Sequence, residues 1–443
     1  MSRVCAAVFV GLWLAGCGLL LDLDPPDDAS ARDATVRADR PCLAVQESCN
    51  GVDDDCDART DEGDALCLGG EVCVEGACAC ETARCDGACV DLAVDPTSCG
   101  ACGVACDDIC RGGVCCAPRS PPIDVLLVID SSNSMVEEQM AFASLLRAFL
   151  ERWDAPLGSL PALDSVHVGI TTPDLGSVHT LPTCSGVGED GEFQTRSRAG
   201  ACSDATFPRF FSFEPDTGAR DQAEEYLRCV MQVGTGGCGF EQPLEAMLKA
   251  VTPSTSSTRF FRDTVGLGDT LHEGFLRPDS ILVVAIVTDE DDCSMADPDL
   301  TDPSAESRYA ATDLNLRCHE HPEALHDVER YRRGLAAVHA PEDTILLVVG
   351  GIPPRLVEED SARILAAPEM SERVDSSGTR LEASCSGGGG NAYPPRRLVE
   401  LGRALEEGGG AAIYGTVCAS NLGAPLERTL DAIAERYALS CPD

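Results

Sequence analysis

One stretch, residues 123–135, constrains the fold more than any other part of the chain. It begins with Ile123–Ile129, a nearly continuous run of aliphatic and β-branched residues, which is typical of a strand buried on both faces of a parallel sheet. Small or polar residues follow, and then apolar residues recur at helical intervals of three and four. We therefore expect Asp130, Ser132 and Ser134 on a strand-to-helix turn, at the sheet edge where open α/β folds bind ligands.

Strands and helices alternate through the rest of this region. The expected strands are 166–170, 281–288, 344–350 and 411–416, and the expected helices are 135–153, 221–232, 241–250, 323–337, 395–406 and 425–437. Such alternation implies parallel crossovers. The sequence therefore predicts an α/β fold with a doubly wound, mostly parallel sheet of Rossmann-like topology.

Three long insertions interrupt this pattern, at about 173–220, 291–321 and 352–393. The first two are expected near the carboxyl edge of the sheet, where they could shape a ligand surface. The third contains Gly387–Gly390, which predicts a flexible loop.

The spacing Asp-x-Ser-x-Ser of Asp130, Ser132 and Ser134 resembles the metal-ion-dependent adhesion site of von Willebrand factor type A domains. That family's site has two further parts: a threonine on a later loop and an aspartate that ends a later buried strand. Thr235 precedes a predicted helix and fits the threonine position, and Asp289 ends the apolar run before it and fits the aspartate position. The resemblance implies a von Willebrand factor A-like fold.

The resemblance implies a Mg²⁺ or Mn²⁺ site. By its precedent, Ser132 and Ser134 bind the ion directly, and Thr235 binds it directly or through water. Asp130 and Asp289 then act mostly through bridging waters. Hydroxyl and carboxylate oxygens suit a hard cation, and neutral hydroxyls next to the ion leave it able to accept a carboxylate from an Asp or Glu of a protein partner.

Two alternatives stay open for these residues. Thr171 or Thr172, which follow another predicted strand, could supply the threonine. The polar residues after Asp130 could also serve only as a helix cap at Met135, although a cap would not require Thr235 or Asp289.

The amino terminus resembles a bacterial lipoprotein signal. Arg3 precedes a short apolar run, and Leu14–Cys17 reads Leu-Ala-Gly-Cys. The resemblance implies a signal peptide over residues 1–16 and acylation, including palmitate, of Cys17, and the alternative is an ordinary secretory signal. We expect a lipid-anchored protein of the cell envelope, in the outer membrane, that faces the periplasm or the medium.

Composition fits this location. The 26 cysteines argue for an oxidising compartment, and the net charge of −41 disfavours nucleic acid and anionic membrane surfaces as partners. The acidic segment 17–41 is predicted to be a disordered tether, so the lipid is the expected membrane contact.

Residues 42–117 form the predicted cysteine-rich stalk, and the von Willebrand factor A-like domain follows over 118–443. The stalk holds fifteen cysteines and few large apolar residues, so disulfides must provide its order. The segment Glu47–Gly63 resembles a cysteine- and aspartate-rich metal-binding repeat of bacterial surface proteins. Four of its acidic residues and the aspartate just after it follow an EF-hand-like spacing that could bind Ca²⁺: Asp53, Asp55, Asp57, Asp61 and Asp64. Ala58 replaces the usual turn glycine, so a solvated acidic turn remains the alternative.

Cysteine spacing gives further expectations. Cys99 and Cys102 have a C-x₂-C spacing that can bind zinc, but disulfides are favoured in an exported chain. Local pairing in the α/β region predicts the disulfides Cys184–Cys202, Cys229–Cys238, Cys293–Cys318 and Cys385–Cys418. Cys441 is left over and is predicted to pair with Cys116 or Cys115.

No sequence pattern of an enzyme is found: a G-x-S-x-G elbow, a P-loop and the H-E-x-x-H motif are all missing. We therefore expect an adhesive, non-enzymatic envelope protein. The alternative is a scaffold lipoprotein whose A-type domain binds nothing.

Overall fold

A computed structural model describes most of the α/β region and much of the cysteine-rich segment. The described residues are 46–62, 66–67, 71–80, 82–106, 109–116, 121–135, 139, 165–184, 186–198, 202, 204–213, 220–387, 390–419 and 423–439. The predicted signal peptide, the predicted lipidation site Cys17, the predicted tether, most of the predicted helix 135–153, Asp64 and Cys441 lie outside them. The chain divides into two compact units, Met1–Cys89 and Val90–Asp443.

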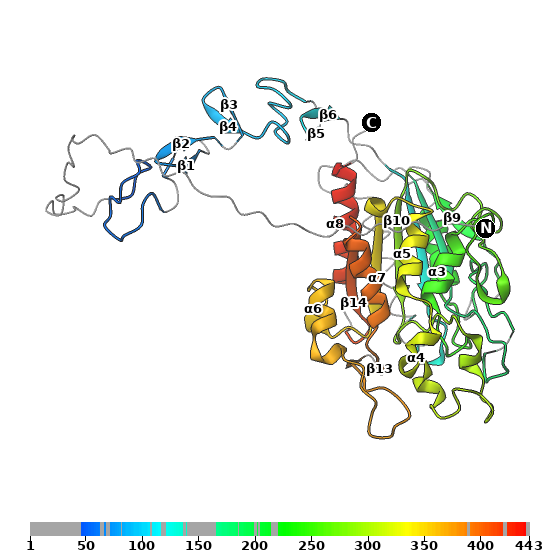
Figure 1. The fold of residues 1–443 in the computed structure, drawn as a ribbon. Helices are drawn as coiled ribbons and strands as arrows, with labels where there is room; N and C mark the ends of the chain where they lie inside the picture. The colour runs from blue at the N-terminus through cyan, green and yellow to red at the C-terminus, as the bar shows by residue number, and fades with distance from the viewer. Residues whose placement is uncertain are drawn as a thin grey trace, which may run out of the picture. The chain divides into compact units, whose positions relative to one another are not determined.

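A six-stranded sheet, in the order β14-β11-β10-β7-β8-β9, is the centre of the second unit (Figure 1). Its strands are β7 (Ile123–Ile129), β8 (Val166–Thr171), β9 (Phe210–Phe213), β10 (Ile281–Val287), β11 (Thr344–Gly350) and β14 (Ala411–Thr416). All neighbours pair in parallel except β8 and β9. The mostly parallel α/β sheet is thus confirmed. The antiparallel strand β9 lies in the first insertion and was not predicted.

Helices cover both faces of this sheet. One face packs against α2 (Arg220–Val230) and α8 (Gly423–Leu439), and the other packs against α3 (Pro243–Val251), α5 (Val328–Ala336) and α7 (Arg396–Glu406). Side chains alternate along β7, so Leu127 joins the first core cluster and Leu126 the second. Because both faces are covered, every residue of β7, β10 and β11 is buried, which explains their continuous apolar sequences.

The direction in which the chain adds strands reverses between β7 and β10. The chain leaves β7 toward β8 on one side and returns to β10 on the other. Ile129 and Val287 are paired at the carboxyl ends of these strands, so the residues that follow them meet at the same edge. This is the switch point at which open α/β sheets bind ligands.

Two of the predicted disulfides are wrong and two are confirmed. The structure pairs Cys184 with Cys238 and Cys202 with Cys229, whereas Cys293–Cys318 and Cys385–Cys418 form as predicted. The first insertion folds back on itself and reaches the Thr235 loop, so each of its cysteines meets a partner that is distant in sequence. Cys115 pairs with Cys106, which removes it as a partner of Cys441.

The loop predicted at Gly387–Gly390 is partly wrong. Strands β12 (Cys385–Gly387) and β13 (Gly390–Ala392) form an antiparallel hairpin there. A methyl group on Gly387 would lie 2.6 Å from the carbonyl carbon of Cys418, so the glycine permits close contact with the disulfide-bonded segment. The third insertion also contains the short helix α6 (Ser361–Ala366), and the second ends at α4 (Arg317–Glu320).

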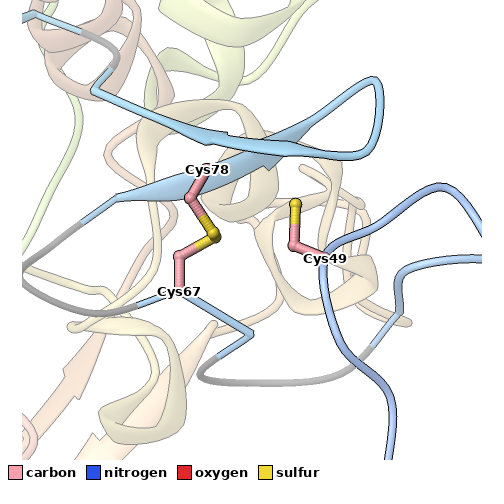
Figure 2. A group of neighbouring side chains, drawn as sticks. All are labelled: Cys49, Cys67 and Cys78. Carbon is pink, nitrogen blue, oxygen red and sulfur yellow. A yellow bond between two sulfur atoms is a disulfide. The ribbon is translucent and has the colours of Figure 1, made fainter.

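The cysteine-rich segment consists of small hairpins held by disulfides. The hairpins are β1–β2 (Val72–Val74, Ala77–Ala79), β3–β4 (Ala83–Cys85, Ala88–Val90) and β5–β6 (Ile109–Arg111, Val114–Cys116). Its disulfides include Cys49–Cys73, Cys67–Cys78, Cys80–Cys89, Cys99–Cys110 and Cys106–Cys115. Cys49, Cys67 and Cys78 lie close together (Figure 2), but each is in a disulfide and so offers no thiolate to zinc.

In the part of the chain that the structure covers, no helix is both long enough and apolar enough to cross a bilayer.

A buried histidine makes the second unit sensitive to acid. His272 is fully buried; its Nδ1–H donates to Ala250 O (2.8 Å), and its Nε2 accepts from the Phe193 N–H (3.0 Å). The imidazole must therefore be neutral in the fold. Burial lowers the pKa of His272 from 6.5 to about 4, so the unfolded chain binds this proton at a higher pH. Stability is then lost as pH falls from about 6.5 toward 4.

We expect His272 to lower the free energy of unfolding by about 2–3 kcal/mol when the pH falls from 7 to 4.5. Urea unfolding followed by circular dichroism at the two pH values should show a smaller loss for His272→Asn than for the native chain. Equal pH dependence of the two proteins would contradict the assignment.

Candidate metal centre

Asp130 is fixed at the junction of the two central strands. Its N–H donates to Val287 O (2.9 Å), which ties the end of β7 to β10. Its carboxylate accepts the Ser132 N–H at Oδ1 (2.7 Å) and the Thr288 hydroxyl at Oδ2 (2.7 Å). The Asp130 side chain is fully buried. The turn that follows β7 is therefore organised around this one carboxylate.

The two serines connect this turn to Asp289. Ser132 Oγ lies 3.0 Å from Ser134 Oγ, and the Ser134 hydroxyl donates to Asp289 Oδ1 (3.1 Å). Ser134 is exposed on the short 3₁₀ helix Asn133–Met135, while Asp289 is buried and its main-chain oxygen accepts the Tyr393 N–H (2.8 Å). The structure thus brings together four predicted residues from turns that follow two different strands.

The loop that carries Thr235 lies against the same turn. Gln139 Nε2 donates to the main-chain oxygens of Asp130 and Gly234, each at 2.8 Å. The Gly237 N–H donates to Ser131 O (2.8 Å). Thr235 itself is half-buried between these two attachment points. The predicted third segment of the site is therefore adjacent to the first.

Gly237 permits this close approach. A methyl group at Gly237 would lie 2.9 Å from Ser131 O, closer than real side chains come. Of the alternative threonines, Thr171 donates its hydroxyl to Glu192 O (3.1 Å) and is fully buried. These contacts favour Thr235 over Thr171.

Sequence reasoning missed two acidic residues, Glu241 and Glu290. The Glu241 side chain is 2% exposed, and its Oε1 has no hydrogen-bond partner among the described residues. Glu290 directly follows Asp289 and is half-buried. The sequence holds one signal for Glu290, because residues 289–292 form a run of four acidic residues. Nothing in the sequence distinguished Glu241.

Burial and neighbouring negative charge raise the pKa of both Glu241 and Glu290. Burial raises the pKa of Glu241 well above its usual range, and Glu290, Asp130 and Asp289 raise it further. Burial also raises the pKa of Glu290 to about 8, with added effects of Asp289 and Asp130. Four carboxyls therefore gather at one edge, and a divalent cation there would relieve their repulsion.

The donor set fits a hard divalent ion. Ser132, Ser134 and Thr235 offer hydroxyl oxygens, and Asp130 and Asp289 offer carboxylate oxygens. Mg²⁺ prefers six oxygen ligands and keeps several waters, which agrees with a shell that mixes hydroxyls with water-bridged carboxylates.

Part of the predicted calcium set in the stalk is also brought together. Carboxylate oxygens of Asp53, Asp55 and Glu47 lie within 4.8 Å of one another. Ala58 has a φ of 73° at the position where an EF-hand loop has glycine. Asp57 Oδ1 accepts the Arg59 N–H, and Asp61 accepts the Asn50 and Gly51 N–H groups. Glu47 was not predicted, and calcium binding stays a prediction.

Comparisons with known proteins give only remote structural matches. No family model and no curated protein matches the chain. A von Willebrand factor type A protein from Catenulispora acidiphila is 12% identical with a TM-score of 0.30, over 73% of this chain and 44% of that one. The PilB minor pilin of Streptococcus sanguinis is 12% identical with a TM-score of 0.33, over 75% of this chain and 66% of that one.

Human COPII-coat protein Sec24c is 10% identical with a TM-score of 0.30, over 73% of this chain and 32% of that one. This chain spans 44% of the length of the Catenulispora acidiphila protein, which is less than half. The observed sheet and its covering helices form an α/β fold with a mostly parallel sheet, and matches this remote show nothing more specific. The case for a metal centre rests on the residues of this chain.

Proposed function

We propose that this protein binds a protein partner through a divalent cation, Mg²⁺ or Mn²⁺, at the switch point of the sheet. The observation that carries the proposal is the chain of contacts from Ser132 to Ser134 to Asp289, next to the buried Asp130. Two turns that are distant in sequence bring their side-chain oxygens together, and the Thr235 loop lies against the first of them. A helix cap would need only the first turn.

The ion would provide one coordination position that faces solvent beside the exposed Ser134. A carboxylate from an Asp or Glu of the partner is the expected ligand, because it is a hard oxygen donor with a charge opposite to that of the ion. Glu241 and Glu290 lie close to Asp130 and Asp289, and a divalent cation would favour the ionised form of these carboxyls more than a monovalent cation would.

We also propose that the protein is anchored to the envelope by lipid on Cys17. The sequence Leu14–Cys17 supports this part, and the tether and the cysteine-rich segment separate the anchor from the α/β unit along the chain. Mass spectrometry of the mature amino terminus would show the acyl groups.

Partner capture from envelope extracts tests the function. We expect the full chain to retain a protein in Mg²⁺ buffer and to release it in EDTA, since the ion bridges the two proteins. Asp130→Asn should retain nothing. Asp279→Asn is the matched control because this exposed aspartate precedes β10 at the opposite end of the strand. Retention that persists in EDTA would contradict the proposal.

A further inference from the structure

A cavity of about 460 Å³ opens next to the candidate metal centre. Glu241 and Glu290 line it on the side of the sheet. Leu314 from the second insertion and Leu381 from the third line it on the other sides. The insertions therefore create a space that a minimal α/β domain would lack.

Acidic side chains outnumber arginines in the lining of this cavity. Six acidic side chains and three arginines line it. Each arginine already has an acidic partner: Arg397 with Asp292 (3.0 Å), Arg396 with Glu372 (3.8 Å) and Arg380 with Asp375 (3.2 Å). Among the described residues, no arginine or lysine pairs with Glu241, Glu290 or Glu400. The cavity is therefore short of cations.

Glu241 gives independent evidence that something is missing. Its side chain is almost completely buried and lines the cavity, yet Oε1 has no hydrogen-bond partner in the described part of the chain. An unsatisfied buried acceptor costs about 1–3 kcal/mol, and more if it is charged. A donor supplied by a ligand would remove this cost.

The walls indicate what kind of ligand carries that donor. Phe240 and Tyr393 contribute rings, and Leu314 and Leu381 contribute aliphatic surface. A single hydrated ion would leave these rings and aliphatic side chains without a partner, and the cavity volume is far larger than the roughly 30 Å³ of one water. A cationic group on an apolar stem suits both the apolar and the acidic side chains of the cavity. The stem can pack on the rings and leucines, and the cationic head can reach the carboxyl groups.

We propose that this cavity binds an arginine or lysine side chain of a partner. The interaction needs no metal ion, so it goes beyond the proposed function and can be tested separately from it. The guanidinium or ammonium group would donate to Glu241 Oε1 and lie close to Glu290, while Phe240 or Tyr393 packs against the stem.

Calorimetric titration of the full chain with small amides, in EDTA, tests the proposal. The probes are Nα-acetyl-arginine methylamide and its lysine counterpart, each compared with the neutral citrulline or norleucine amide. We expect a cationic probe to bind in the millimolar range and its neutral counterpart to bind at least tenfold more weakly. Failure of both cationic probes, or equal affinity for the neutral ones, would overturn the proposal.

Variants then locate the binding site. Glu241→Gln should weaken the cationic probe at least tenfold, and Leu381→Trp, in a half-buried loop position, should block the cavity without touching an acid. Glu273→Gln, which removes an exposed carboxylate elsewhere, should change nothing. If saturating Mg²⁺ abolishes binding of the probe, Glu241 belongs to the metal centre and the proposal is overturned. Unchanged binding within about threefold supports it.

Discussion

Asp130→Asn is expected to lower the affinity for Mg²⁺ about 100-fold and to leave the metal-free fold intact. The carboxylate is buried at the junction of β7 and β10, where its charge acts on a cation in a medium less polar than water. Loss of a carboxylate that acts through bridging water typically costs metal sites 10- to 100-fold. Isothermal titration calorimetry with Mg²⁺ measures this directly.

Asparagine keeps the local hydrogen bonds of Asp130. Its Oδ1 can still accept the Ser132 N–H, and its Nδ2 can donate to the Thr288 hydroxyl, which now has to rotate. The substitution also removes a negative charge beside Glu241 and Glu290. The melting temperature of the metal-free variant should therefore equal or exceed that of the native protein.

Melting experiments separate a metal defect from a folding defect. If the proposed site binds Mg²⁺, the ion at 100 times its dissociation constant should stabilise the native protein by about 2.7 kcal/mol. This increment should vanish in Asp130→Asn and persist in Asp279→Asn, whose aspartate is exposed before β10. If Mg²⁺ does not change the melting temperature of the native protein, the proposed metal centre is wrong.

The sheet was predictable because burial on both faces leaves a simple signature. β7, β10 and β11 are nearly continuous apolar runs, and each ends abruptly at a turn. The strand β9 left no such signal, since Phe210–Phe213 is a short antiparallel edge strand within a long insertion. Its position depends on pairing with β8, which no local pattern shows.

The site was predictable only in part, for a related reason. Asp130 and Asp289 stand where buried strands end, so topology alone brings them together. Glu241 and Glu290 become notable only through burial, and an acidic residue in a sequence does not reveal whether it is solvated. The disulfides show the same limit: pairing by nearness in sequence gave Cys293–Cys318 but missed Cys184–Cys238, whose cysteines are 54 residues apart.

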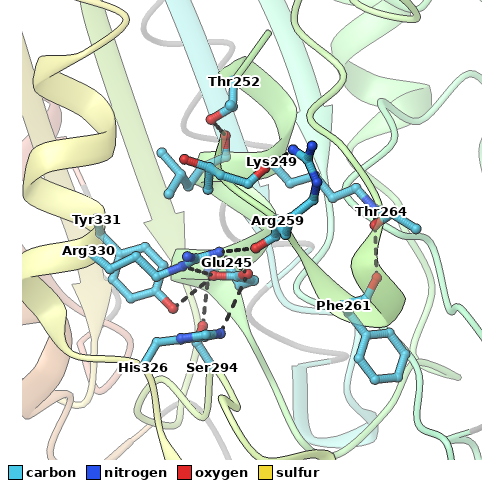
Figure 3. A network of polar contacts seen from close by, with 12 residues as sticks. Glu245, Lys249, Thr252, Arg259, Phe261, Thr264, Ser294, His326, Arg330 and Tyr331 are labelled. Atoms are coloured by element: carbon cyan, nitrogen blue, oxygen red, sulfur yellow. Dashed lines mark hydrogen bonds and ion pairs between the residues drawn. The ribbon is translucent and has the colours of Figure 1, made fainter. Parts of the chain in front are cut away.

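Glu245→Ala is expected to destabilise the α/β unit by about 3 kcal/mol. Glu245 is buried on α3, and Figure 3 shows it at the centre of a polar network. Its carboxylate accepts from Arg330 at both oxygens (Nε–Oε2 3.0 Å, Nη2–Oε1 2.8 Å) and from the Tyr331 hydroxyl (3.0 Å). Its N–H donates to Ser294 Oγ (3.0 Å). Glu245 therefore joins α3, α5 and the second insertion.

Removing this carboxylate leaves two groups without their acceptor. The Tyr331 hydroxyl is fully buried and cannot turn to water, and the Arg330 guanidinium is only 23% exposed. Removing one partner of a buried pair typically costs 3–5 kcal/mol. We take the lower end of that range because Arg330 keeps its bond to Arg259 O (2.6 Å) and reaches some solvent.

An exposed pair with the same chemistry is the matched control. Glu369 accepts from Arg355 at both Nε and Nη2, but both side chains lie at the surface, 40% and 58% exposed. Glu369→Ala should cost less than about 1 kcal/mol, because water replaces the lost contact. Urea unfolding followed by circular dichroism, with the disulfides intact, compares the two variants. Equal losses of stability would mean that the Glu245 network contributes no more than a surface ion pair.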